Sequence, residues 1–413
     1  MQETPIAGNG LLSRRLYLRL AAAGAGSAVL LPAIANEPWE RGSGQPPSGY
    51  GEPSRFARLT RERVGGHPFG PAAGSSSTPL QHLNGVLTPN SLHFERHHSG
   101  IPDIDPVRHR LTVHGRVRRP LRFSHESLLR YPLTSRVMFL ECSGNSYQNT
   151  GAEAPDLTAG QLSGLLSCAE WTGVPLSLLL EEAGMLADAA SGWLVAVGAD
   201  ASGNNRSLPL PIALGDAMVA LYQNGEPLRP AQGYPMRLFV PGCEGNVSIK
   251  WLKALEVRDQ PAHTREETSK YTDLLPDGSA RQFTLRMEVK SIITSPSGRM
   301  RLPERGVYEI SGLAWSGSGA IRRVEVSADG GRSWTDADLQ TEAAALRPVR
   351  FRIPWRYAGA PALLMSRATD DTGAVQPSRD AALAGQSVQT FYHYNGIQSW
   401  RVDEQGRVSN AFA

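Results

Sequence analysis

Cysteine is scarce in this chain of 413 residues. Three cysteines, Cys142, Cys168 and Cys243, are too few for a disulfide scaffold, and no two of them are spaced as C-x-x-C. Without such pairs a structural zinc site is not expected, and without a C-x-x-C-H motif the chain carries no c-type haem of its own. Cys168 and Cys243 are expected to be core thiols or, as an alternative, a disulfide.

Charge of one sign and long apolar runs are also missing. The formal net charge is +3, charged residues make up 20% of the chain and apolar residues 40%. No Lys/Arg run is long enough for a nucleic-acid interface. The composition excludes a multi-span membrane protein and a wholly disordered chain. Among the 42 basic residues only four are lysine. The arginine excess is typical of a GC-rich genome, although guanidinium groups also suit oxyanions.

Residues 1–35 have the pattern of an export signal. Arg14 and Arg15 form a twin-arginine motif, and the modest apolar run at 20–35 ends in an A-x-A cleavage pattern at 33–35. The run is shorter than the roughly 20 residues that a spanning helix needs. We therefore expect a removable twin-arginine signal, export of the folded protein to the periplasm, and no membrane span in the mature form.

The rest of the chain divides by composition into an arm and two domains. Residues 36–93 are rich in Gly, Pro and Ser, which predicts an extended arm with little regular structure. Residues 94–275 predict an α+β domain. Residues 284–413 predict an all-β, immunoglobulin-like sandwich, because short alternating strands recur there between turn signals.

Several elements of the α+β domain can be placed from the sequence. Ser124 can cap a short helix over 124–129, and a second helix is predicted over 176–183, where Gly184 ends it. Strands are predicted where apolar residues alternate or run together, at 111–117, 137–140, 193–197, 217–222 and 237–240. In the sandwich, strands are predicted at 307–313, 323–327, 349–353, 363–368 and 388–393.

One cysteine follows a predicted buried strand. The strand at 137–140 leads to Cys142, and Ser143, Gly144 and Asn145 then allow a tight turn and close approach of a ligand. A thiol in this position can be a nucleophile, a ligand of a soft metal or an inert buried side chain. The spacing alone does not choose among these three.

Several motifs follow one another in a fixed order along the chain. Besides the cysteine loop at 138–146, they are FERHH at 94–98, GYPMRLFVPG at 233–242, VSIKWL at 247–252, AWSG at 314–317 and VEVSADGGRSW at 324–334. In this order they resemble the sulfite oxidase family of molybdenum enzymes, in which the thiolate of the cysteine loop binds molybdenum beside the dithiolene of molybdopterin. The resemblance therefore favours a metal ligand at Cys142. The resemblance covers roughly residues 82–402.

A narrower resemblance points to one branch of this family. Segments 93–106, 266–276 and 391–400 look like the molybdenum subunit of Sox thiosulfate-oxidising systems. This branch implies a sulfane sulfur on a carrier protein as the substrate and a separate cytochrome c subunit as the electron acceptor. The family likeness also implies that the C-terminal sandwich forms a homodimer.

The resemblance assigns a role to nine residues. Cys142 is expected to bind the metal. Arg96, Tyr271 and Arg352 are expected to surround the substrate. The residues expected to hold the cofactor are His98, Asp200, Arg206, Arg237 and Lys250. Physical chemistry agrees with these types, since a phosphate needs cations and a phenol donates without adding charge.

Some features leave other interpretations open. The loop with Asp200 and Arg206 can be an ordinary solvated loop, and Arg352 alternates with apolar residues as a solvent-facing side chain would. Gln232 stands where sulfite oxidases often have a cofactor-binding histidine, and Gln cannot be cationic. Histidines 93, 97 and 98 suggest zinc, but no further ligand spacing completes such a site.

The sequence therefore predicts a molybdopterin-dependent oxidoreductase that oxidises carrier-bound sulfane sulfur. The first alternative is a free sulfite:cytochrome c oxidoreductase. A nitrate reductase is less favoured, because no flavin or haem domain is attached. An alternative of another class is a metal-free binding subunit that has kept the fold.

Overall fold

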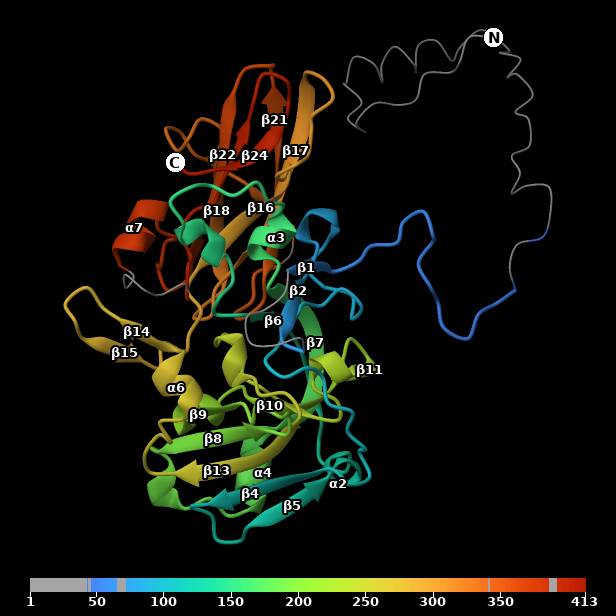
Figure 1. Ribbon diagram of the computed structural model, residues 1–413, viewed down its shortest axis with the longest axis vertical. Helices are drawn as coiled ribbons and strands as arrows, with labels where there is room; N and C mark the ends of the chain where they lie inside the picture. The colour runs from blue at the N-terminus through green and yellow to red at the C-terminus, as the bar shows by residue number, and fades with distance from the viewer. Residues whose placement is uncertain (1–42, 44–45, 65–71, 341, 386–391) are drawn as a thin grey trace. The chain divides into compact units, whose positions relative to one another are not determined.

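The fold was analysed in a computed structural model that describes residues 43, 46–64, 72–340, 342–385 and 392–413. The predicted export signal at 1–35 lies outside these residues. Residues 59–413 form one compact unit, separate from the described residues before them. All the described helices and strands belong to this unit (Figure 1).

Two sheets form the half of this unit that is drawn lower in Figure 1. In the first sheet the strands run in the order β5-β4-β13-β8-β9, with β13 parallel to β4 and the other pairs antiparallel. In the second sheet the order is β11-β10-β7-β6, and β12 also pairs with β10. The bounds are β4 Arg110–Gly115, β5 Leu121–Ser124, β6 Thr134–Glu141, β7 Leu166–Pro175, β8 Trp193–Gly198, β9 Asn205–Pro209, β10 Met218–Gln223, β11 Glu226–Pro227, β12 Arg237–Phe239 and β13 Leu252–Arg258.

The other half is an antiparallel sandwich of two sheets, as the sequence predicts. One sheet has the order β16-β17-β21-β20 and the other the order β19-β18-β22-β23-β24. Apolar side chains from both sheets, such as Trp315, Phe351 and Trp400, fill the space between them. The bounds are β16 Lys290–Ser295, β17 Gly306–Trp315, β18 Ile321–Ser327, β19 Thr335–Asp336, β20 Asp338–Leu339, β21 Val349–Tyr357, β22 Ala362–Asp370, β23 Ser399–Val402 and β24 Val408–Ala411.

The described helices are short. Ser124 caps α2 as predicted, accepting a hydrogen bond from the Ser127 backbone N–H, and Thr158 and Thr264 start α3 and α6 with complete capping boxes. The bounds are α2 His125–Leu128, α3 Ala159–Ser163, α4 Leu176–Glu182, α5 Leu210–Ala213, α6 Arg265–Ser269 and α7 Arg379–Ala384, with 3-10 turns η2 Leu80–His82, η3 Tyr147–Thr150, η4 Ala187–Ala189, η5 Pro230–Gln232 and η6 Gly245–Val247. No described helix has the length and apolar character that crossing a membrane requires.

The structure differs from the sequence prediction in the arm. Residues 62–64 and 74–77 form strands β1 (Glu62–Val64) and β2 (Gly74–Ser77), which join β3 (Glu95–His97) in a small sheet of order β1-β2-β3. Pairing with β3 organises this Gly- and Ser-rich segment, whose composition alone suggests a coil. The arm therefore positions the first strand of the candidate site.

Two further segments lie between or beyond the predicted elements. A hairpin of β14 (Thr272–Leu274) and β15 (Ala280–Gln282) occupies the region where the sequence suggests a domain boundary. The strand predicted at 388–393 falls mostly outside the described residues, and Tyr392 and His393 form a bend.

A buried ion pair joins the two halves. Glu141, the last residue of β6, accepts hydrogen bonds from Lys290 of β16 at 3.1 Å and from the Trp315 indole of β17 at 2.6 Å. Glu141 is fully buried and Lys290 is 4% exposed. The core of the sandwich also includes Phe139 of β6 and Cys168 of β7, so the apolar packing is continuous across the halves.

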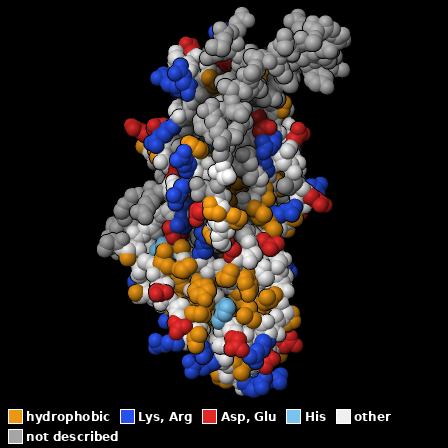
Figure 2. All heavy atoms as spheres, turned by 90° about the vertical axis from the view of Figure 1, so that its right-hand side faces the viewer, with side chains coloured by type: hydrophobic (Ala, Val, Ile, Leu, Met, Phe, Trp, Pro, Cys, Tyr) orange, Lys and Arg blue, Asp and Glu red, His pale blue; other side chains and the backbone are white. Residues whose placement is uncertain are grey.

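The surface is uneven in its polarity. Figure 2 shows apolar side chains gathered on one face of the half that contains β4 and β5, with charged side chains along the lower edge and over the sandwich.

The three cysteines are free thiols, so the disulfide alternative for Cys168 and Cys243 is wrong.

Candidate functional site

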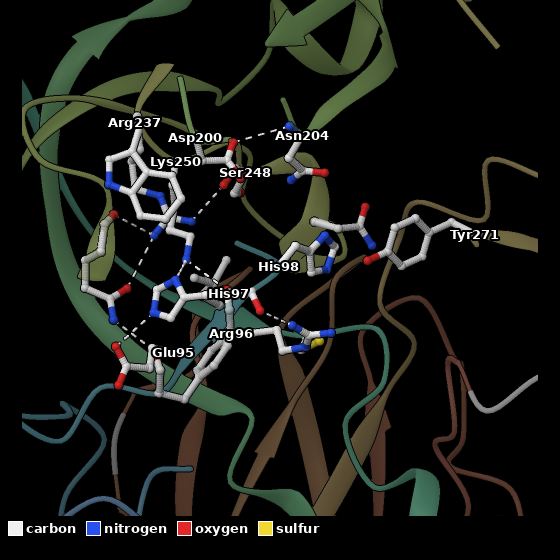
Figure 3. Close-up of a pocket in the computed structure, with 17 residues that line it drawn as sticks. Glu95, Arg96, His97, His98, Asp200, Asn204, Arg237, Ser248, Lys250 and Tyr271 are labelled. Carbon is white, nitrogen blue, oxygen red and sulfur yellow. Dashed lines mark hydrogen bonds and ion pairs between the residues drawn. The ribbon is translucent and has the colours of Figure 1, made fainter. Parts of the chain in front are cut away.

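One cavity brings together seven of the nine residues that the sequence predicts for the site. The space among its side chains, including the part open to solvent, is about 710 Å³. The predicted residues that line it are Arg96, His98, Cys142, Asp200, Arg237, Lys250 and Tyr271. They come from β3, the end of β6, the β8–β9 loop, β12, the segment before β13 and the segment after α6 (Figure 3).

The end of β6 presents the Cys142 thiol to the cavity. The Cys142 backbone N–H donates to the Leu165 carbonyl at 2.9 Å. The preceding residue, Glu141, is buried and is held by the hydrogen bond that it accepts from Lys290. Burial raises the pKa of the Cys142 thiol, although a backbone hydrogen bond from Gly144 and the Arg96 charge act in the opposite direction. A thiol in this setting needs an added positive charge, such as a metal ion, to become a thiolate.

Residues 95–98 place a cation and a neutral imidazole beside this thiol. The Arg96 guanidinium donates to the backbone carbonyl of His97. Burial, and then the Arg96 charge, lower the pKa of His98 to about 4. His98 is therefore neutral near pH 7 and can donate a hydrogen bond without adding charge to the site.

Two cations, the buried Arg237 and the partly buried Lys250, occupy the opposite side of the cavity from Tyr271 (Figure 3). Arg237 is 2% exposed and donates to the carbonyls of Gln232 at 3.1 Å and Ser248 at 2.8 Å. The Lys250 ammonium donates to the Arg96 carbonyl at 2.9 Å. Burial lowers the pKa of Arg237 to about 9 and that of Lys250 well below its usual value.

Neither cation has a carboxylate within 4.0 Å among the residues that the structure describes. The Nε of Arg237 is buried without a hydrogen-bond partner in that part of the chain. Gly233, with φ +109°, lets the two segments approach closely, since a Cβ there would lie 3.1 Å from both Arg237 and Lys250. The arrangement fits an anion that the protein itself does not supply.

A chain of polar side chains that the sequence analysis did not select holds Lys250. The Lys250 Nζ lies 2.8 Å from His97 Nδ1, His97 Nε2 lies 2.9 Å from a Glu95 oxygen, and Arg61 pairs with Glu95 at 3.1 Å. Burial alone would raise the pKa of Glu95, but hydrogen bonds from His97 and Ser76 and the Arg61 charge lower it to about 2. Alternation within β3 was the available signal, since Glu95 and His97 share a face.

The β8–β9 loop adds polar groups to the wall. Asp200 accepts a hydrogen bond from the Asn204 backbone N–H at 3.3 Å, and the Asn204 side-chain oxygen is buried without a partner among the described residues. Gln232, the departure from the family pattern, is buried, and its amide donates to the Phe94 carbonyl at 2.8 Å. Gln232 thus fixes the start of β3.

Arg206 does not line this cavity, and its role as a cofactor ligand stays a prediction. Its guanidinium lies 4.6 Å from the centre of the Tyr271 ring and pairs with Glu244 at 2.9 Å and Glu267 at 3.7 Å. It also donates to the Asn246 side chain. Because two carboxylates already neutralise this cation, it supports Tyr271 from behind rather than facing a ligand.

Arg352 is also absent from the lining of this cavity, and its place in the substrate pocket stays a prediction. It lies on β21, where it pairs with Glu309 of the neighbouring β17 and approaches Asn84 at 3.4 Å. Cross-strand charge pairing in the sandwich accounts for this side chain.

The cavity fits molybdopterin in two respects. Arg237 and Lys250 would hold its phosphate, and Cys142 would bind its metal. In the described part of the chain, no three His, Cys, Asp or Glu side chains form a metal site by themselves. The dithiolene of molybdopterin would supply soft donors of the same kind as the Cys142 thiolate.

Two family models match the chain. Residues 98–266 match the oxidoreductase molybdopterin binding domain, and residues 281–399 match the Mo-co oxidoreductase dimerisation domain. The two matched ranges lie on either side of residues 267–280, within which β14 begins the hairpin.

Relatives and a solved structure agree with these matches. The chain is 30% identical to mitochondrial sulfite oxidase of Mus musculus over 72% of its own length and 59% of that relative. It is 31% identical to a nitrate reductase [NAD(P)H] of Hordeum vulgare over 73% of its length and 36% of that relative. The chain thus spans less than two thirds of these relatives. The crystal structure of the sulfane dehydrogenase SoxCD from Paracoccus pantotrophus matches with 42% identity and a TM-score of 0.88, over 92% of this chain and 98% of that one.

Proposed function

Because the chain belongs to the sulfite oxidase family of molybdopterin oxidoreductases, we propose that it oxidises sulfane sulfur held by a carrier protein and passes the electrons to a SoxD-like cytochrome c subunit. The carrying observation is the cavity itself. It places the Cys142 thiol near Arg96 and Tyr271, and two buried cations without carboxylate partners in the described chain on its opposite side.

The side chains around Cys142 suit a reduced sulfur substrate. When bound, the molybdenum cofactor would supply a two-electron acceptor and transfer oxygen that derives from water. Arg96 would hold the negative charge of the sulfur group, and the Tyr271 phenol would donate a hydrogen bond to it. Arg206 keeps the Tyr271 ring in place, and neutral His98 adds a donor.

Two observations favour a carrier-bound sulfane over free sulfite. The SoxCD structure matches over nearly its whole length, whereas the sulfite oxidase match covers 59% of that relative. Arg352 also lies outside the cavity, so it adds no cation for a free dianion. Free sulfite remains the second candidate substrate, because sulfite oxidases are relatives of this chain.

The proposal includes a partner and a location. The sequence has no C-x-x-C-H motif, so electrons must leave to a separate haem protein. The twin-arginine pattern favours export of the folded, cofactor-loaded protein to the periplasm. The dimerisation-domain match favours a homodimer through the sandwich.

Metal content tests the enzyme class first. Mass spectrometry of the purified chain, made with cofactor synthesis intact, should find about one molybdenum per chain. Cys142→Ser should reduce the metal content and abolish turnover, because a harder ligand replaces a soft thiolate. Cys168 is a second free cysteine and lies away from the cavity, so Cys168→Ser should keep both the metal content and the turnover of the wild type. Absence of molybdenum from the wild-type chain would instead favour the metal-free binding subunit.

Substrate preference tests the finer proposal. Cytochrome c reduction should be measured with sulfite alone and with a carrier protein loaded with sulfane sulfur. We expect turnover that depends on the loaded carrier. Equally rapid turnover with sulfite alone would assign the chain to the sulfite:cytochrome c oxidoreductases.

A further inference from the structure

A second cavity lies beside the candidate active site. It is formed by the β14–β15 region, helix α7 and residues 392–395, and its volume with the part open to solvent is about 630 Å³. On the α7 side its wall consists of Ala381, Ala382 and Gly385, whose small side chains leave room for a ligand. None of the predicted site residues lines it.

Tyr392 separates this cavity from the one that contains Cys142. Tyr392 lines the second cavity, and its ring packs against the Tyr271 ring with centroids 5.1 Å apart. Tyr271 in turn lines the first cavity. A Cβ on Gly144, two residues after Cys142, would lie 4.0 Å from the Tyr392 ring. The paired phenols therefore stand between the two cavities, next to the cysteine loop.

The cysteine loop itself holds Tyr392 in this position. The backbone N–H of His393 donates to the Ser143 carbonyl at 2.8 Å, and the His393 ring lies 3.5 Å from a Glu244 oxygen. His393 has φ +58°, a left-handed conformation that is unfavourable for a residue with a side chain. These contacts outweigh that cost, so Tyr392 has a defined place relative to Cys142.

The charges around the second cavity favour one kind of occupant. Asp273 and Glu288 contribute carboxylates and Arg281 one guanidinium. Asp273 accepts a hydrogen bond from Thr284 at 2.9 Å. A free dianion gains little in this setting, whereas a sulfur group on a neutral extension of a larger molecule meets no such penalty.

We propose that the second cavity is the approach by which the sulfur-bearing end of the substrate reaches the part of the first cavity between Arg96 and Tyr271, and that Tyr392 is a positioning residue at its inner end. This inference rests on the proposed function. In this proposal the C-terminal half contributes Tyr392 to the substrate pocket, whereas the sequence predicts that it contributes Arg352.

A bulky residue on α7 tests the approach. Ala381 lines the second cavity, whereas Ala384, on the same helix and also exposed, does not. In the molybdenum-loaded chain, Ala381→Trp should lower kcat/KM for the carrier-bound substrate by about tenfold, mostly through KM. Ala384→Trp should keep the wild-type value. Equal kcat/KM for the two variants, at equal molybdenum content, would overturn the proposal.

Thiol labelling gives a readout that does not depend on turnover. In the full-length chain made without cofactor, the labelling of Cys142 by a bulky maleimide is followed by mass spectrometry, with the buried Cys168 and Cys243 as internal references. Tyr392→Ala should speed this labelling and Ala381→Trp should slow it. Tyr392→Phe, which keeps the ring, should label as the wild type does.

The two proposals fail in different ways. Equal labelling rates in the wild type, Tyr392→Ala and Ala381→Trp would overturn the proposed approach through the second cavity, even in a chain that oxidises sulfur. Labelling that responds as expected, in a chain without molybdenum or turnover, would support the approach and overturn the proposed function.

Discussion

Lys250 shows at the scale of one residue how this site is prepared for a ligand. Its ammonium group is buried and donates to the Arg96 carbonyl and the His97 ring, and the described part of the chain places no carboxylate within 4.0 Å of it. Burial lowers the pKa of Lys250 well below its usual value, and the charges of Glu95 and Asp200 offset this effect only in part. An anion in the cavity, such as the phosphate of molybdopterin, would stabilise this cation further.

Replacing this cation should loosen the cofactor. Lys250→Met removes a charge-assisted hydrogen bond, which contributes roughly 1.5–3 kcal/mol, so we expect cofactor affinity to fall by about tenfold or more. Molybdenum per chain after prolonged dialysis measures this. Lys253→Met, at an exposed position three residues along, is the matched control. Equal retention by both variants would remove Lys250 from the cofactor site.

Sequence reasoning found the residues that carry the chemistry better than those that support them. Cys142, Arg237 and Lys250 stand in motifs, and the structure brings them to one cavity. Arg206 and Arg352 lie outside this cavity, where they pair with Glu244 and Glu309, partners that are remote in the sequence. The chain from Lys250 to Glu95 and the contact of Tyr392 with Tyr271 depend on burial and tertiary packing, which no local spacing reports.

His93 should make the stability of the protein depend on pH. The ring is fully buried between Phe94 and Trp171, and burial lowers its pKa to about 3. Between about pH 6.5 and pH 3 the unfolded chain therefore binds a proton that the folded chain does not. The free energy of unfolding falls as the pH decreases through this window, by up to about 1.4 kcal/mol per pH unit from this group.

A variant without this histidine isolates that contribution. His93→Phe keeps an aromatic ring in the same packing and removes the titratable group. Urea unfolding at about pH 7 and about pH 5 should show a smaller loss of stability for the variant than for the wild type. Identical losses in the two proteins would assign the pH dependence to other histidines.

Among the elements, strands with a clear apolar pattern were predictable and strands that depend on a partner were not. The strands predicted at 193–197 and 349–353 correspond to β8 and β21. By contrast, β2 has the sequence GSSS, and it exists because its backbone pairs with β3. The consequence is functional, since β3 carries Arg96 into the cavity.

Gly312 lies where neighbouring strands of the sandwich are packed closely. It lies in β17, between Ile293 of β16 and Phe351 of β21, and a Cβ there would overlap the Ile292 carbonyl and the Phe351 ring. Gly312→Ala should therefore destabilise the chain by roughly 1–3 kcal/mol. The urea midpoint measures this, with Gly215→Ala as the control because its nearest atom would be 3.5 Å away. The same urea midpoint for Gly312→Ala and Gly215→Ala would show that β17 can shift without loss of stability.

For the whole molecule, the central question is whether its two halves act as one. Glu141 connects them, because it accepts hydrogen bonds from Lys290 and Trp315 of the sandwich and also from Asn145 of the cysteine loop. The residue after Glu141 is Cys142. Movement of the sandwich relative to β6 therefore acts on the residue next to the metal ligand through this buried carboxylate, in addition to the apolar packing between the halves.

Lys290→Met tests this coupling. Burial lowers the pKa of Lys290, yet the nearby Glu141 favours its charged form, and loss of the lysine leaves Glu141 buried without its counter-charge. We expect destabilisation by roughly 3–5 kcal/mol and partial recovery in the double variant Glu141→Gln/Lys290→Met, since the uncompensated charge is then gone.

Hydrogen exchange followed by mass spectrometry shows where that stability is lost. Since the pair joins β6 to β16, amides of β6 and β7 should lose protection together with those of β16 and β17 in Lys290→Met. Molybdenum content should fall as well, because Glu141, which accepts a hydrogen bond from Asn145 of the cysteine loop, loses one of its two partners in the sandwich. Loss of protection confined to the sandwich, with wild-type molybdenum content, would mean that the halves are independent and that Cys142 is fixed by β6 alone.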